Sequence, residues 1–502
     1  MELSSSNAAP WKLALGGLLA AAATAALCAA AQRTPAKKSK SKMKVPDILL
    51  DWDLSPEDIV KIGRDIIAKW KALDECVAAQ NEPTFATTFA KLIDLERELD
   101  PIENAITFPM HVSPDEKVRS AAKTIEKELT AFGVESSMRR DVYVVYKAAS
   151  EKHKNDNSLS EEEKRFMEKV VLAYERNGMN LGVEEMKEME ALKKELADLA
   201  TTFSTSIAED DTTHLATPEE LAGCSESFVN GLDTDPDSGK LVLTMAYPHY
   251  MTVQRLCTVP ATREALEKKF NSRCKDTNVE RLQRMCQLRA DIAAKLGYQS
   301  HAHHKLEIRM AKTPERVTEF LTDLSNKLGP IADKELEVLK ELKAETEGGD
   351  KDDQVIHMWD YRFYMNLVEE KNYQVDHEVL RQYFPFDTVL QGMLSIYRDA
   401  FGLEFEELKD TVTWHKNVLL YKVKQNDGRH QRLLGYFYLD LWPRTNKYSH
   451  AACWPLQPAC ILPSGERRPA VTALVCNFPA PKEDGSPSLL EHNEVVTFFH
   501  EL

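Results

Sequence analysis

The spacing of apolar residues predicts helices over most of the chain. The first clear example begins at Ser55, a common N-cap residue, followed by Pro56 at the first helical position. Apolar residues then recur every three or four positions, at Ile59, Ile62, Ile66, Trp70, Leu73 and Val77. This period places them on one face of an α-helix, so we expect an amphipathic helix here.

Three further segments carry the same helical pattern. Ser160 and Glu163 have the spacing of a capping box, and Thr313 with Pro314 opens another helix. A long stripe of apolar residues follows the first of these, at Met186, Met189, Leu192, Leu196, Leu199, Phe203 and Ile207. A stripe of Met and Leu at this spacing is typical of core packing, and we expect one long helix.

Strand patterns are few and lie mainly near the end of the chain. Residues 418–423 and 433–441 flank Asn426, Asp427 and Gly428, which are residues typical of a hairpin turn. Residues 470–478 form a third candidate strand, and the earlier residues 240–247 are expected to pair elsewhere. The fold class predicted is mainly α, with a small antiparallel sheet just before the terminal helix.

Length and composition narrow the class of protein. At 502 residues the chain is expected to form two subdomains. A formal net charge of -16 and the absence of any Gly-rich phosphate-binding motif argue against nucleic-acid and nucleotide partners. Nine cysteines without C-x-x-C pairs indicate reduced thiols of a cytoplasmic protein rather than a disulfide framework.

An apolar leader precedes the helical body. Residues 13–31 contain no charge and are long enough to span a bilayer, while six basic residues lie between Arg33 and Lys44. These basic residues favour an anchor that keeps the body on the cytosolic side of a membrane. Ala29 to Ala31 also form a possible cleavage site, so a removed targeting peptide and an organellar destination stay open.

The chain closes on NEVVTFFHEL, an apolar helical pattern that ends in a His-Glu pair. In the zinc motif His-Glu-x-x-His, two imidazoles one helical turn apart bind the metal, and the Glu between them faces the bound water. Three letters of that motif are weak evidence by themselves. Without further support, His500 is a terminal residue with no special role.

Several other stretches make the resemblance specific. From about Asp51 onward the chain resembles the thimet oligopeptidase and neurolysin family of zinc metallopeptidases. The stretches that carry the resemblance are LDWDLSP, HVSPDEKVRSAA, YPHY, TREALEKKFNSRCK, GYFYLDLWPRTNKYSHAAC and SLLEHNEVVTFFHEL. Two departures from the usual pattern are Trp442 in place of Tyr and Trp454-Pro455 in place of Phe-Gly.

The resemblance implies a fold, an activity and two site residues. It implies two helical subdomains flanking a deep channel, and a metalloendopeptidase that cuts short peptides and acts as a monomer. His500 would be the first zinc ligand and Glu501 the general base. The remaining ligands of the single Zn²⁺ ion would lie beyond Leu502, so we expect the chain as given to be truncated within the motif, to hold no stable zinc and to be inactive. We divide it into a leader and linker (1–45), a mostly helical region (46–250) and an incomplete catalytic region (251–502).

Alternatives remain at three places. The cluster His301 to His304 has a spacing that suits a transition metal, although surface or packing roles fit it better. His492 is expected to start a helix rather than bind metal. Residues 436–448 and 470–478 are either sheet core or exposed edges to which a peptide adds. For the whole protein, the alternative to a peptidase is a catalytically dead peptide-binding or membrane-tethered protein.

Overall fold

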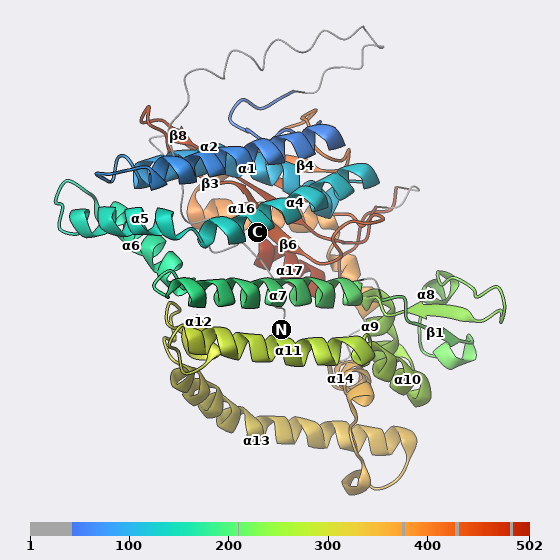
Figure 1. Ribbon diagram of the computed structural model, residues 1–502. Helices are drawn as coiled ribbons and strands as arrows, with labels where there is room; N and C mark the ends of the chain where they lie inside the picture. The colour runs from blue at the N-terminus through green and yellow to red at the C-terminus, as the bar shows by residue number, and fades with distance from the viewer. Residues whose placement is uncertain (1–42, 209, 374–376, 427–430, 482–484) are drawn as a thin grey trace. The chain divides into compact units, whose positions relative to one another are not determined.

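The computed structural model describes residues 43–208, 210–373, 377–426, 431–481 and 485–502 (Figure 1). These residues form two compact units. Unit 1 combines the chain up to Asn180 with His377–Leu502, and unit 2 is Leu181–Asp376. The leader, residues 13–31, and the possible cleavage site lie outside the described residues. No helix in the described ranges has both the length and the hydrophobicity that a membrane span requires.

Six helices form the N-terminal part of unit 1, and their starts follow the sequence signals. Ser55 caps α1 with a capping box to Asp58, and Ser160 caps α6 in the same way with Glu163. Ile59, Ile66, Trp70, Leu73 and Val77 are buried along α1, as the pattern predicts. The helices are α1 (Pro56–Ala78), α2 (Phe89–Thr107), α3 (Pro109–Val112), α4 (Glu116–Ser137), α5 (Arg140–His153) and α6 (Glu161–Arg176).

The C-terminal part of unit 1 contains a five-stranded sheet, in the order β3-β4-β5-β9-β6. The predicted hairpin pairing is confirmed, because β4 and β5 pair antiparallel; residues 427–430 between them lie outside the described ranges. The strands are β3 (Leu403–Glu407), β4 (Leu419–Asn426), β5 (Gln431–Asp440), β6 (Ala452–Gln457) and β9 (Ala470–Val475). A separate pair, β7 (Cys460–Ile461) and β8 (Arg467–Arg468), lies between β6 and β9 in the chain.

The prediction of an antiparallel sheet is wrong at one pairing. β5 and β9 run parallel, with Gly435 opposite Ala470, so the sheet is mixed. A Cβ atom at Gly435 would lie 2.5 Å from the carbonyl oxygen of Ala470, which explains why this close pairing needs glycine. The chain reaches β9 only after passing through β6, a connection that local patterning does not reveal.

Helices cover both faces of this sheet. On one face, Tyr436, Tyr438 and Val471 pack with Phe108 and Val112 from α2 to α3. On the other face, side chains of β4, β5 and β9 pack against α16 (Phe386–Phe401) and α17 (His492–Glu501). Short turns α15 (His377–Leu380) and η4 (Arg381–Tyr383) lead into α16.

Unit 2 is mainly helical. In it α7 and α11 lie side by side, joined by the ion pair between Glu195 and Arg284 (Figure 1). The predicted strand near residue 240 is confirmed, since β2 pairs with β1. Its elements are α7 (Val183–Ala208), β1 (Thr213–Ala216), η2 (Glu219–Leu221), α8 (Glu226–Asn230), β2 (Leu241–Thr244), α9 (Tyr247–Leu256), α10 (Pro260–Asn271), α11 (Lys275–Lys295), α12 (His301–Leu306), α13 (Pro314–Glu347), η3 (Lys351–Asp353) and α14 (Met358–Tyr373).

The structure confirms a mainly helical fold with small sheets. The contact-based units divide the chain near residues 180 and 376, whereas the sequence suggested a boundary near residue 250. The three-part division of the sequence and the channel between subdomains both stay predictions.

Candidate functional site

The terminal helix α17 starts where the sequence suggests. Glu491 is its N-cap, and a capping box joins it to Glu494, whose carboxylate accepts a hydrogen bond from the Glu491 backbone N–H at 2.8 Å. His492 is the first helical residue, as expected of a helix start. The helix then runs to Glu501, so the His-Glu pair lies in its last turn.

One apolar side chain fixes α17 against the sheet. Phe498 is completely buried, and its ring centroid lies 5.8 Å from that of Phe386 and 5.6 Å from that of Phe478. Val495, Phe499 and Leu502 pack around the same cluster, but Val496 is 53% exposed. The apolar face of this helix is therefore narrower than the sequence suggests.

The last turn presents His500 and Glu501 differently. His500 is exposed and Glu501 is half-buried. The charge of Glu501 acts on two thiols, those of Cys453 in β6 and Cys476 just after β9. Burial raises the pKa of Cys453, and the negative charge of Glu501 adds to that rise. Glu501 thus lies within electrostatic reach of both thiols.

A buried ionic cluster supports this end of the sheet. Both carboxylate oxygens of Asp440 accept hydrogen bonds from Arg444 at 2.7 Å, and the Nζ of Lys447 lies 2.9 Å from Oδ1 of Asp440. Lys447 also donates to the carbonyl oxygen of Cys476 at 2.5 Å. Burial alone would raise the pKa of Asp440, but the two cations outweigh it and the pKa is lowered. The cluster therefore ties the end of β5 to the segment just after β9.

Sequence reasoning missed this cluster. The available signal was the spacing of Asp440, Arg444 and Lys447 at the end of an apolar strand. Charged side chains close to buried residues are costly unless they pair with each other. The pairing with Cys476, 29 residues further on, is not visible in that spacing.

Both strands that the sequence offered as possible edges are interior. β5 lies between β4 and β9, and β9 lies between β5 and β6, so each is paired on both sides. The edges are β3 and β6. Pro455 lies in β6, consistent with an edge position, because proline has no backbone N–H to donate to a neighbouring strand.

The described residues do not bring together the ligand set that a metal site requires. No group of three His, Cys, Asp or Glu side chains in these ranges could hold one metal ion. In the cluster at the start of α12, His304 is buried, and Nε2 of His303 lies 3.4 Å from Glu315. These positions agree with packing and surface roles. A catalytic zinc ion takes three protein ligands, so the described residues do not fit a complete site.

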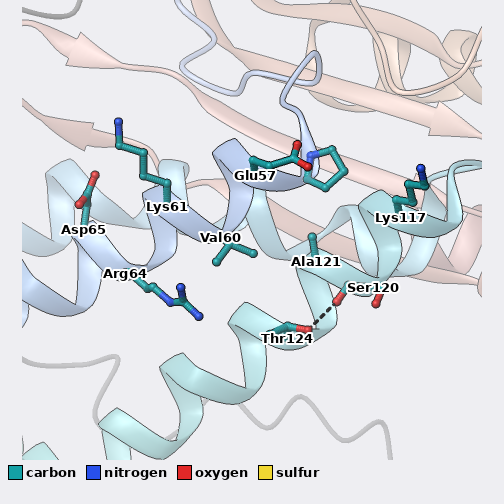
Figure 2. Close-up of a pocket in the computed structure, with 10 residues that line it drawn as sticks. Glu57, Val60, Lys61, Arg64, Asp65, Lys117, Ser120, Ala121 and Thr124 are labelled. Carbon is teal, nitrogen blue, oxygen red and sulfur yellow. Dashed lines mark hydrogen bonds between the residues drawn. The ribbon is translucent and has the colours of Figure 1, made fainter.

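An open groove lies elsewhere in unit 1. It runs between α1 and α4, and its lining residues come from these two helices alone (Figure 2). Glu57, Lys61, Arg64 and Lys117 are among them, so both charge signs face the groove. Neither His500 nor Glu501 lines it.

Comparison with known proteins decides the family. A thimet-like oligopeptidase of Dictyostelium discoideum is 33% identical over 464 residues, which are 90% of this chain and 69% of that protein. The sequence pattern described as Peptidase family M3 matches residues 253–502. The chain belongs to peptidase family M3. This confirms the resemblance to thimet oligopeptidase and makes the protein a member of a metalloendopeptidase family.

Other members of family M3 extend the comparison. Saccharolysin of Saccharomyces cerevisiae is 31% identical and is covered over 65% of its length. Oligopeptidase A of Escherichia coli is 27% identical and is covered over 68% of its length. The chain therefore spans about two thirds of the length of these relatives. As in other metallopeptidases, a metal cofactor is expected of the family in general.

Proposed function

We propose that the protein is a zinc-dependent endopeptidase of short oligopeptides, with His500 as a zinc ligand and Glu501 as the general base. The observation that carries the proposal is the place of this pair in the last turn of α17, with Glu501 within electrostatic reach of Cys453 in the edge strand β6. Relatives named thimet-like oligopeptidase and oligopeptidase A support the substrate class.

The proposed roles follow from the chemistry of the two side chains. His500 is exposed, so its imidazole is accessible to a metal ion. The carboxylate of Glu501 would accept a proton from the water that attacks a peptide carbonyl. The zinc ion, when bound, would acidify that water.

We also propose that the 502-residue chain alone neither holds zinc nor cleaves peptides. A lone imidazole at the end of a helix leaves a zinc ion mostly hydrated, because the other protein ligands of a three-ligand site are missing from the described residues. This proposal concerns the given residues and not the relatives, which are longer.

A peptide substrate would be held by β6. An extended peptide can add to an exposed strand edge through main-chain hydrogen bonds, which suits substrates of varied sequence. β6 lies at the edge of the sheet, and Cys453 in this strand lies within electrostatic reach of Glu501. A channel between two helical subdomains, as the family resemblance implies, would exclude folded proteins.

The test compares two chains. One is the 502-residue chain. The other carries, after Leu502, the further residues that would supply the remaining zinc ligands. Both are assayed for bound zinc and for cleavage of a short quenched fluorescent peptide. We expect zinc and chelator-sensitive cleavage in the extended chain only, and loss of cleavage in its Glu501→Gln variant with zinc retained. Stoichiometric zinc and cleavage by the 502-residue chain would contradict the proposed inactivity. An extended chain that binds zinc and peptide without cleavage would contradict the proposed enzyme.

A further inference from the structure

Two cysteines of unit 2 lie across a tight backbone contact. Cys224 lies in the loop between η2 and α8, and Cys257 directly follows α9. Next to them, the backbone N–H of Thr258 donates to the carbonyl oxygen of Ala222 at 2.8 Å. A Cβ atom at Gly223, which has a φ of +92°, would lie 2.4 Å from the carbonyl oxygen of Leu256. The two segments are therefore held in direct contact by the backbone, independently of the cysteines.

The two thiols influence each other's pKa, and the Sγ of Cys257 donates a hydrogen bond to the carbonyl oxygen of Glu220 at 3.3 Å. Both side chains belong to the same apolar cluster, in which Cys257 is fully buried and Cys224 is half-buried. The hydrogen bond from the Cys224 thiol lowers the pKa of Cys257 to about 7, and the positive charge of Arg263 contributes. The same hydrogen bond raises the pKa of Cys224. Cys224 is the more accessible of the two thiols.

We propose that Cys224 and Cys257 form a reversible intramolecular disulfide on exposure to a low-molecular-weight disulfide such as glutathione disulfide. Both thiols are free in this structure. The backbone contact and the shared apolar cluster bring the two side chains together, and a disulfide needs two side chains at short range. The site is separate from His500 and Glu501 in the sequence and does not depend on the proposed peptidase activity.

The exchange is balanced by the oxidant. Cys224, the more accessible thiol, loses its proton as it attacks one sulfur of glutathione disulfide; the S–S bond of the oxidant breaks, and the leaving glutathione thiolate takes up that proton. The Cys257 thiolate then attacks the Cys224 sulfur of the mixed disulfide, and the second glutathione leaves. Two protein thiols are oxidised to one disulfide, and one glutathione disulfide is reduced to two thiols.

The bond would restrain the segment between the two cysteines. This segment contains α8, β2 and α9, which share the apolar cluster with Cys257. A cross-link between its ends lowers the entropy of the unfolded segment. A protease would therefore cleave this segment of unit 2 more slowly in the oxidised protein than in the reduced protein.

The experiment uses the full chain incubated with glutathione disulfide or with reduced glutathione. Remaining thiols are then alkylated under denaturing conditions, and peptides are mapped by mass spectrometry without reduction. We expect a peptide pair linked through Cys224 and Cys257 in the oxidised sample, and its loss when excess reduced glutathione is added. The Cys224→Ser variant should lack the pair, whereas Cys286→Ser, which changes an exposed cysteine of α11, should keep it.

The outcome is decisive in either direction. Alkylation of both Cys224 and Cys257 as free thiols in the oxidised protein would overturn the proposal, as would a linked pair that joins either of them to a different cysteine. Since Cys257 is buried, its Ser variant could fail to fold, but Cys224 is half-buried and its variant can be checked for a native circular dichroism spectrum before the mapping. Slower proteolysis of residues 225–256 in the oxidised wild type, absent in Cys224→Ser, is the second expected result.

Discussion

Replacing Phe498 by alanine tests whether α17 is fixed by a single buried ring. Fully burying an aromatic side chain removes ~150 to 250 Å² from water. At about 25 cal/mol per Å² this corresponds to about 4 to 6 kcal/mol. Phe498 has 0% exposure and two aromatic neighbours, so little of that burial is lost to solvent. Measured Phe→Ala substitutions in cores cost about 3 to 5 kcal/mol, and we expect about 4 kcal/mol here.

The same helix offers a matched control. Val496 is 53% exposed, so Val496→Ala should change the free energy of unfolding by less than about 0.5 kcal/mol. Urea unfolding followed by tryptophan fluorescence is a suitable assay, because the ring of Trp442 lies 5.0 Å from that of Phe386 in the same cluster. If Phe498→Ala unfolds within about 1 kcal/mol of Val496→Ala, the helix that carries His500 and Glu501 is not held as described.

Three other substitutions probe charges in unit 1. Burial raises the pKa of Glu96 to about 9, so between about pH 5 and 9 the folded state keeps a proton that the unfolded state has lost. Stability should therefore fall as pH rises from about 5 to about 9. Glu96→Gln should flatten this fall in thermal unfolding scans, and an unchanged slope would refute the assignment. Asp440→Asn should destabilise the protein by about 3 to 5 kcal/mol in urea, because it leaves two buried cations uncompensated; Glu406→Gln, at an exposed ion pair, should have no measurable effect. Glu501→Gln should lower the pKa of Cys453 and speed its alkylation at mildly alkaline pH, whereas an equal rate would place Glu501 away from β6.

Local signals predicted the helices, and non-local pairings escaped prediction. Ser55 and Ser160 could be read as caps because each makes its bonds within three residues. The insertion of β9 between β5 and β6 could not be read, because it depends on which strands meet after the chain has folded back. The residues Asn426, Asp427 and Gly428 are typical of a hairpin turn and so predicted the antiparallel pairing, but no comparable sequence signal marks a parallel neighbour.

The candidate site also has one part that the sequence predicted and one part that only the structure shows. His500 and Glu501 were identified through a family motif, and their place in a helix followed from the apolar residues around them. The proximity of Glu501 to Cys453 joins residues 48 positions apart in the sequence numbering, and so it required the structure. From the sequence, Val496 counted among the apolar residues of this helix, but in the structure it is 53% exposed. The helix is too short for its apolar pattern to show which side faces the cluster.

Unit 1 is built from two stretches of the chain that are separated by unit 2, so its two parts are synthesised at different times. Helices α1 to α6 are synthesised before unit 2, while the sheet that covers Phe108 and Val112 is synthesised after it. At about 5 to 20 residues per second, the roughly two hundred residues of unit 2 take on the order of 10 to 40 s to make. During that interval the nascent helices expose the apolar surface that later binds the sheet. Chaperone capture of the growing chain would therefore be most useful between the synthesis of α6 and that of β9.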